Sequence, residues 1–333
     1  MRITVIEAFN KFMVETVNLD PDQTIKARSS REWLVGQIGT FSDKDERFPY
    51  IYTEKNIFFG SFTRRTKKRP LDDIDMMICL KANGCTYYEY SDRIELTVPD
   101  SATRFLDYRN EGTSILNSRK LINAFVRKLS GIPQYKSADV KRNQEAATLN
   151  LISYDWVFDI VPCFFTTPEL DGRTFYIIPD GNGNWKKTDP RLDSARLSQL
   201  NKTHEGNLLN VIRAVKYWNT RPTMPTMSSY LLENMILDYY SEQTTVASKY
   251  VDIEIEKVLI EIHRRVYNSV NDPKNIQGNL NNLSSDDKKK ISERAYQDYS
   301  KAFDARQFEN AKNYKDSINN WIEIFGDKFP RYE

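Results

Sequence analysis

Hydrophobic and polar positions follow two different periods along the first 188 residues. Apolar residues at helical spacing predict three helices, over 2–18, 28–39 and 113–130. Short apolar or alternating runs predict strands over 56–59, 73–80 and 175–178, with one or two more within 86–98. The runs 145–152 and 156–165 flank Ser153-Tyr154-Asp155 and predict a hairpin. This part of the chain is therefore expected to combine helices with a mixed sheet.

The pattern changes near Asp189, beyond which only helical periodicity remains. Helices are expected over 190–219, 228–241, 247–269, 285–310 and 312–325, with Ser284 or Ser285 as the N-cap of the fourth. We therefore expect an α+β protein with two lobes, a mixed-sheet core over 1–188 and an all-helical lobe over 189–333. The first helix is expected to cross to the helical side, and a ligand to bind in the cleft between the lobes.

Composition excludes several classes of protein. The 333 residues carry a net charge of only +2, which is too little to imply a coat of nucleic acid. Three widely spaced cysteines and two histidines provide neither a disulfide framework nor a zinc module. No apolar run approaches the ~18 residues of a membrane span, and no signal-peptide pattern opens the chain. A cytoplasmic protein without a membrane partner is expected.

Two aspartates on one predicted strand are the first candidates for chemistry. Side chains alternate across a strand, so Asp73 and Asp75 share one face while Ile74 and Met76 pack on the other. Neighbouring carboxylates repel each other unless a cation lies between them. Asp72 falls on the opposite face at the start of the strand. Taken alone, the pair also fits a solvated turn or a calcium-like cluster.

A third carboxylate, Asp159, lies on a later strand whose other face carries Trp156, Phe158 and Ile160. Three carboxylates from two strands could hold two Mg²⁺ ions about 3.5–4 Å apart, with Mn²⁺ as the alternative ion. Such a pair suits in-line displacement at phosphorus. The competing interpretation is a surface pair of aspartates and an unrelated Asp159 at the edge of the core.

Gly60 and Ser61 would supply the complementary half of the site. Glycine lets the backbone approach a triphosphate closely, and the Ser61 hydroxyl adds a hydrogen-bond donor. A Gly-Ser pair means little by itself, but its position before the two carboxylate strands makes the combination specific. Between the turn and the first strand, residues 64–69 are strongly basic, which fits a solvated loop or an electrostatic guide for phosphates.

These segments together resemble the DNA polymerase β-type nucleotidyltransferase superfamily. The resemblance rests on Phe59-Gly60-Ser61, Thr66, Leu71-Asp72-Asp73-Ile74-Asp75 and Phe158-Asp159-Ile160-Val161-Pro162. Within it, the chain is most similar to the bacterial cGAS/DncV-like nucleotidyltransferases. Residues 207–219 resemble the spine helix of that family, and Ser228-Ser229-Tyr230-Leu231-Leu232-Glu233 resembles the helix start that follows it. The resemblance covers roughly residues 55–240.

The resemblance implies an enzyme that uses NTPs such as ATP and GTP to make a cyclic oligonucleotide second messenger during phage infection. The product activates a separate effector protein. Lys216 and Ser229 match positions that contact the triphosphate, and Tyr230 matches a position where a ring stacks on the base. The residues themselves leave alternatives open, because Lys216 also fits an ordinary polar helix face and Tyr230 a core tyrosine.

Three functions remain open at this point. The first is synthesis of a cyclic dinucleotide from NTPs with release of pyrophosphate, a trinucleotide being the other ring size. The second is a template-independent tRNA or poly(A) nucleotidyltransferase, which would need an extended basic groove. The third is a binding module that has lost its activity. The chain has no counterpart of the zinc-binding insertion with which animal cyclic GMP-AMP synthase engages DNA, so no dependence on DNA is expected.

Overall fold

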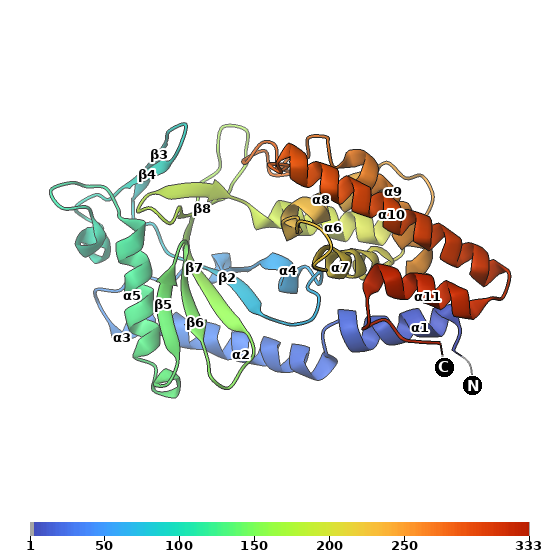
Figure 1. Ribbon diagram of the computed structural model, residues 1–333. Coiled ribbons are helices and arrows are strands. Elements are labelled where there is room, and N and C mark those ends of the chain that lie inside the picture. The colour runs from blue at the N-terminus through green and yellow to red at the C-terminus, as the bar shows by residue number, and fades with distance from the viewer. Residues whose placement is uncertain (1–2, 333) are drawn as a thin grey trace. The chain divides into compact units, whose positions relative to one another are not determined.

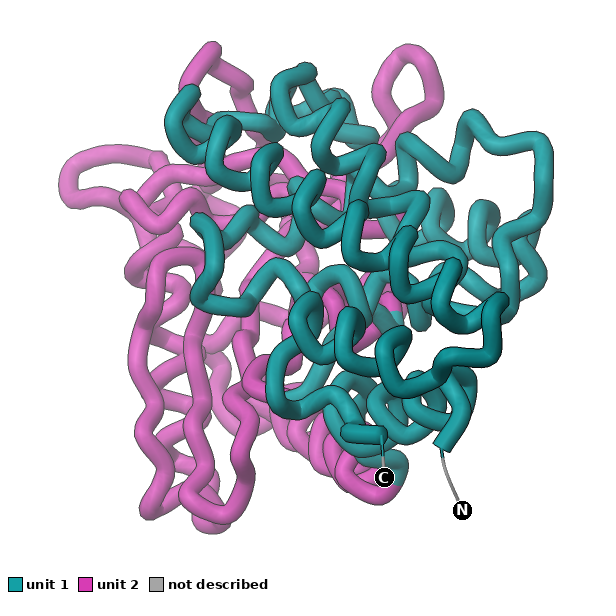
Figure 2. Tube along the Cα trace, turned by 45° about the vertical axis from the view of Figure 1, so that its right-hand side comes forward, with its two compact units in different colours: residues 1–21, 65–70, 192–333 teal, residues 22–64, 71–191 magenta. Residues whose placement is uncertain are grey.

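The computed structural model describes residues 3–332, which divide into two compact units (Figure 2). The α/β unit contains residues 22–64 and 71–191. The helical unit contains the N-terminal segment up to Pro21, the short segment 65–70, and the chain from Leu192 onward. Segment 65–70 has no counterpart in the domain boundaries expected from the sequence.

The α/β unit is built on one mixed sheet (Figure 1). Its strands are β1 Ile57–Phe58, β2 Asp73–Cys79, β3 Thr86–Glu89, β4 Ile94–Thr97, β5 Asp139–Asn143, β6 Ala146–Asn150, β7 Val157–Phe165, β8 Tyr176–Pro179 and β9 Trp185–Thr188. They run in the order β1-β2-β7-β8-β9-β4-β3, with β6 also paired to β7 and β5 to β6. The β2–β7 pair is parallel, and every other pair in the sheet is antiparallel. The expected mixed sheet and the β6–β7 hairpin are confirmed.

Alternation of side chains explains why β2 and β7 lie inside the sheet. Ile74, Met76 and Ile78 on β2 are all buried on one face. Phe158 and Ile160 on β7 lie level with Ile74 and Met76 and are buried as well. This face belongs to the core, and the opposite face carries Asp73 and Asp75 on β2 and Val157 and Asp159 on β7.

The helices of the α/β unit are α2 Pro21–Gly39, α3 Phe41–Lys44, α4 Gly60–Thr63 and α5 Ser118–Ser130, with 3₁₀ turns at Thr53–Lys55, Thr103–Tyr108 and Pro133–Tyr135. Two expected boundaries are wrong. α2 begins at Pro21 rather than 28, where proline suits the first helical position. α5 begins at Ser118 rather than 113, because the Asn117 side chain caps it by accepting a hydrogen bond from the Lys120 N–H. α5 packs against β5, β6 and β7.

The helical unit contains α1 Val5–Phe12 with a π-helical continuation over Met13–Val17, then α6 Pro190–Thr203, α7 Leu208–Asn219, α8 Ser229–Ser241, α9 Val251–Arg265, α10 Ser285–Asn310 and α11 Tyr314–Phe325. The expected single helix over 190–219 is wrong. Glu205 and Gly206 take left-handed backbone conformations, with φ of 56° and 87°, and separate α6 from α7. Ser284 is the N-cap of α10.

Aromatic side chains hold α1 to the later helices of this unit. The Phe9 ring meets Trp321 edge to face with centroids 4.8 Å apart, and Phe12 meets Tyr217 in the same way at 5.2 Å. Edge-to-face pairs of aromatic rings stabilise packing beyond the contribution of the apolar area that they bury. The N-terminal helix therefore belongs to the core of the helical unit. Across residues 3–332, none of the helices combines the length and apolar character that crossing a bilayer requires.

Candidate active site

Three carboxylates gather on one face at the beginning of β2 and β7. In the parallel pairing of these strands Asp75 lies directly opposite Asp159, and Asp73 lies opposite Val157. Asp73 is two residues before Asp75, so both point to the face that carries Asp159. All three residues are half-buried. The sequence-predicted carboxylates are therefore neighbours on adjacent strands.

A hydrogen bond, burial and a neighbouring negative charge all act on the Asp159 carboxylate. The Thr148 hydroxyl, from β6, donates a hydrogen bond of 2.6 Å to Oδ1 of Asp159. Burial raises the pKa of Asp159, the Thr148 hydrogen bond lowers it, and the negative charge of Asp73 raises it again, so that the net change is upward. Asp73 is thus close enough to Asp159 for the two charges to interact. Positive charge brought to this face would relieve that repulsion.

The Gly60-Ser61 turn lies against the same carboxylates. The Phe59 N–H donates to the backbone oxygen of Asp75 over 3.3 Å. Gly60 has φ of +73°, and a Cβ atom placed on it would lie 1.8 Å from Oδ2 of Asp75. Only glycine can bring the backbone this close to the carboxylate in this conformation. The turn and the carboxylate face, predicted separately from the sequence, come together within the α/β unit.

The polar part of this face ends after Asp75 and Asp159. The next residues on it, Met77 and Cys79 on β2 and Val161 and Cys163 on β7, are buried in a small apolar cluster. Metal or phosphate chemistry on this face is therefore confined to the first residues of the two strands.

The three carboxylates are oxygen donors of the kind that a divalent ion needs. Within residues 3–332, the structure has no group of three or more Asp, Glu, His or Cys side chains already arranged around a common point. The donor chemistry nevertheless fits Mg²⁺, which prefers carboxylate oxygens and tolerates several water ligands. Rotation about the Cβ–Cγ bond of aspartate is soft, so these adjacent carboxylates can turn toward one ion without movement of the strands.

Lys216 is buried inside the helical unit rather than exposed on a polar helix face. Its side chain comes from α7, and Nζ lies 3.0 Å from Oε2 of Glu233 on α8. The Thr66 hydroxyl donates to the same Glu233 oxygen over 2.9 Å. All three residues are at most 4% exposed. Glu233 was missed as a partner, although a carboxylate within the apolar run of α8 signals that a buried cation accompanies it.

Segment 65–70, which contains most of the basic run over 64–69, belongs to the helical unit and is anchored there by hydrogen bonds. Arg213 donates to the backbone oxygen of Arg65 over 2.9 Å. The Arg69 side chain donates to the backbone oxygens of Asn18 and Val14, at 2.8 and 3.2 Å. The segment thus forms bonds at both of its ends in addition to the buried Thr66.

Ser229 and Tyr230 open α8. Ser229 is exposed, and the preceding Ser228 caps the helix by accepting a hydrogen bond from the Leu231 N–H over 3.2 Å. Tyr230 is half-buried, and its hydroxyl is bound by side chains of Asp193 and Asp272. The polar end of Tyr230 therefore joins a network of charged side chains.

No protein-family model matches the chain, but individual known proteins resemble it over nearly its whole length. A probable cyclic nucleotide synthase of Bacillus cereus strain VD146 is 44% identical over 331 residues, which cover 99% of each chain. Escherichia coli MS115-1 CdnC, solved with ATP, superposes with a TM-score of 0.69 at 16% identity over 98% of this chain and 99% of that one. Escherichia coli DncV, solved with 3′-deoxy GTP, gives 0.62 at 13% identity over 96% of each chain.

The two solved structures establish the fold, a mixed sheet followed by helices, and the Bacillus relative establishes the family. The identity of 44% extends over 99% of both chains. This chain is therefore an enzyme of the bacterial cGAS/DncV-like nucleotidyltransferase family.

Proposed function

We propose that this enzyme joins two NTPs into a cyclic dinucleotide and releases pyrophosphate as each bond forms. The observation that supports it is the shared face of Asp73, Asp75 and Asp159 against the Gly60-Ser61 turn. The 3′ hydroxyl oxygen of one nucleotide bonds to the α-phosphorus of the other, pyrophosphate leaves with its bonding electrons, and the hydroxyl proton passes to solvent. The same exchange on the linear intermediate closes the ring.

Asp73, Asp75 and Asp159 would hold the divalent ions as oxygen ligands. Mg²⁺, or Mn²⁺ in its place, supplies charge neutralisation at the triphosphate and lowers the pKa of the attacking hydroxyl. Thr148 contributes by fixing one oxygen of Asp159, which leaves the other available. Gly60 allows the backbone to approach the phosphates, and the half-exposed Ser61 provides a hydroxyl donor beside them. The acceleration comes from positioning and charge rather than from a covalent intermediate.

Ser229 and Tyr230 form the nucleotide-binding set of the helical unit in this proposal, and Lys216 supports them. The exposed Ser229 hydroxyl binds phosphate, and the half-buried Tyr230 ring stacks on a base. Lys216 acts as the cation that holds α8 through Glu233, one helical turn beyond Ser229 and Tyr230. The relatives solved with ATP and with 3′-deoxy GTP support NTPs as the ligands.

A reaction with all four NTPs and Mg²⁺ tests the proposal. Mass spectrometry should detect a phosphatase-resistant cyclic dinucleotide together with pyrophosphate, formed without any RNA; a cyclic trinucleotide would change only the ring size. Extension of added tRNA or poly(A) with no product from NTPs alone would instead establish the template-independent nucleotidyltransferase. Absence of pyrophosphate under both conditions would identify a binding module.

The product is proposed to act as a second messenger in anti-phage signalling, through a separate effector that binds it. The family resemblance implies this role, and the Bacillus relative, named a probable cyclic nucleotide synthase, supports a cyclic nucleotide as the product. The net charge of +2 gives little attraction for DNA, so synthesis should not require it. Bacteria that carry the enzyme with its effector should resist phage, and an Asp73→Asn enzyme should abolish that resistance.

A further inference from the structure

The loop between α9 and α10 is folded around Asp272. Oδ2 of this buried carboxylate accepts hydrogen bonds from the N–H groups of Ile276 and Gln277, at 3.1 and 2.9 Å. Oδ1 accepts from the Lys274 N–H over 3.2 Å, and the Asp272 N–H donates to the Gly278 oxygen over 2.8 Å. Hydrogen bonds to this one carboxylate thus give the loop a defined conformation.

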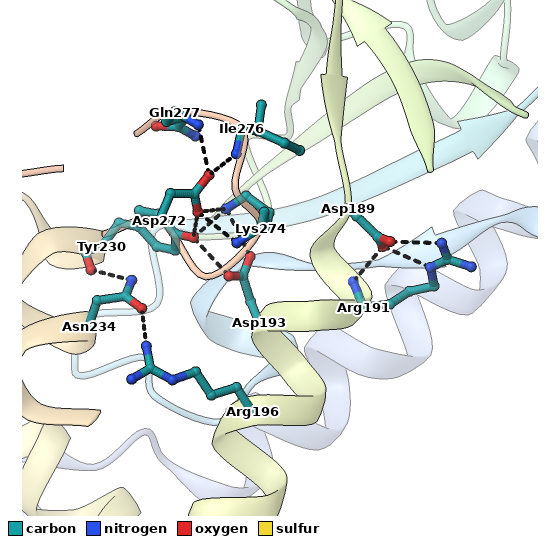
Figure 3. A network of polar contacts seen from close by, with 10 residues as sticks. All are labelled: Asp189, Arg191, Asp193, Arg196, Tyr230, Asn234, Asp272, Lys274, Ile276 and Gln277. Atoms are coloured by element: carbon teal, nitrogen blue, oxygen red, sulfur yellow. Dashed lines mark hydrogen bonds and ion pairs between the residues drawn. The ribbon is translucent and has the colours of Figure 1, made fainter. Parts of the chain in front are cut away.

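This loop meets the first turn of α8 at Tyr230 (Figure 3). The Tyr230 hydroxyl lies 2.8 Å from Oδ1 of Asp193 and 2.9 Å from Oδ1 of Asp272. A phenol has one proton, so it donates to one of these carboxylates at a time and accepts from the Lys274 ammonium, which contacts it directly. The polar end of the ring is therefore held by three charged side chains.

Lys274 also covers the ring itself. Its Nζ lies 4.2 Å from the centre of the Tyr230 ring, a cation–π contact. The same ammonium lies 3.2 Å from Asp272 and 3.3 Å from Asp193, and the Lys274 side chain is only 5% exposed. Its positive charge is thus balanced by the two carboxylates of the network.

The backbone of Tyr230 is also held by a hydrogen bond, which is separate from those at its hydroxyl. Asn234, one turn later on α8, donates from its side chain to the Tyr230 backbone oxygen over 2.9 Å (Figure 3). Arg196 on α6 in turn donates to the Asn234 side chain over 2.9 Å. Both ends of Tyr230 are held, which leaves its ring little freedom to rotate.

We infer that Asp272 and Lys274 are positioning residues that hold the Tyr230 ring ready to stack on the base of a bound nucleotide. The inference rests on the base-stacking role proposed for Tyr230. A ring fixed before binding loses little conformational entropy when the base arrives, so affinity increases without any new contact to the nucleotide. Lys274 occupies one face of the ring, and the base takes the other.

A double-mutant cycle on nucleotide affinity tests this inference. The full-length enzyme is titrated calorimetrically with the α,β-methylene analogues of the four NTPs, whose bridging carbon prevents release of pyrophosphate. Tyr230→Leu removes the ring and should weaken binding roughly tenfold, within the range of base stacking on aromatic residues. Lys274→Met should weaken binding roughly threefold in the unchanged enzyme but have less than about a twofold effect when Tyr230 is already leucine.

Conservative variants distinguish a loss of ring positioning from a failure of the protein to fold. Tyr230→Phe and Asp272→Asn keep the shape of each side chain and should each weaken binding by roughly the same factor as Lys274→Met. Lys289→Met, at an exposed lysine of α10 whose Nζ is 3.9 Å from Glu293, should leave binding unchanged. Equal effects of Lys274→Met with and without the Tyr230 ring would show a general structural role and overturn the inference. Unchanged affinity in Tyr230→Leu would overturn it as well, whereas synthesis by the unsubstituted enzyme tests the proposed function separately.

Discussion

The backbone of Gly60 lies so close to Asp75 that a Cβ atom at residue 60 would approach Oδ2 of Asp75 to 1.8 Å. The atom in the way is the end of a side chain, so the clash can be relieved by turning the carboxylate away. That rotation would move the Asp75 carboxylate from its position on the face that it shares with Asp159. Residue 60 therefore controls the position of a candidate metal ligand from another segment of the chain.

Gly60→Ala should reduce activity far more than stability. A displacement of about 1 Å at a catalytic group can lower the rate about 100-fold, and left-handed backbone strain at alanine destabilises by about 1 kcal/mol. The rate of pyrophosphate release and the urea midpoint measure the two effects. Gly112→Ala is the matched control, since Gly112 has φ of +69° and nothing within 4 Å of its added Cβ. Equal activity losses in the two variants would mean that backbone strain alone is responsible.

The Thr148 hydroxyl should matter for turnover because it orients Asp159 through a hydrogen bond of 2.6 Å. Thr148→Val keeps the shape but removes the donor, and a bond to a charged group contributes about 1.5–3 kcal/mol, so activity should fall about tenfold or more. Thr148→Ser retains the hydroxyl and should retain most of the activity. The measurement is the initial rate of pyrophosphate release at saturating NTP. Indistinguishable rates for the valine and serine variants would refute the orienting role.

The buried Lys216–Glu233 pair should contribute to the stability of the fold, whereas the sequence motif associates Lys216 with the triphosphate. Lys216→Met removes the ammonium that lies 3.0 Å from the buried Glu233 carboxylate, and breaking such a pair typically lowers the free energy of unfolding by about 3–5 kcal/mol. Replacing both residues, as in Lys216→Met with Glu233→Leu, should recover most of the loss. Urea denaturation measures each value. A stable Lys216→Met protein that has lost nucleotide affinity would show instead that Lys216 acts on the triphosphate.

The stability provided by Asp272 should disappear at acid pH. Burial alone would raise the pKa of Asp272, but the Gln277 N–H, the Tyr230 hydroxyl and Lys274 outweigh it and bring that pKa below its ordinary 3.8. A depressed pKa stabilises the fold above the unfolded value and loses that contribution as pH falls through the folded value. The difference in unfolding free energy between wild type and Asp272→Asn should therefore be constant from pH 7 to about 5 and shrink below about pH 4. A difference that grows on acidification would contradict the assignment.

The candidate carboxylates could be predicted from the sequence because their signal is local. Period-two alternation alone places Asp73 and Asp75 on one face and Asp72 on the other, and Asp72 is indeed exposed just before β2 begins. The register that sets Asp75 opposite Asp159 is not local. It depends on the parallel pairing of two strands far apart in the chain, which no turn between them determines.

Strands β5 and β9 and the position of Thr66 could not be predicted, because these segments lack a hydrophobic pattern of their own. β5 reads Asp-Val-Lys-Arg-Asn and is mostly exposed, so only its pairing with β6 makes it a strand. β9 is a short run of Trp185, two lysines and a threonine, and its position is set by the buried tryptophan. The place of Thr66 in the helical unit depends on Glu233 and Lys216, whose side chains meet it only in the folded structure.

The central claim is that Asp73, Asp75 and Asp159 together hold the ions on which nucleotidyl transfer depends. The most direct test is the rate of pyrophosphate release by the Asp→Asn variant at each position, with the exposed Asp72→Asn as the control. The account predicts that each of the three variants loses at least about 100-fold in rate while it keeps the wild-type urea midpoint, and that Asp72→Asn stays within about twofold of the wild-type rate. Full turnover in any of the three would contradict the account.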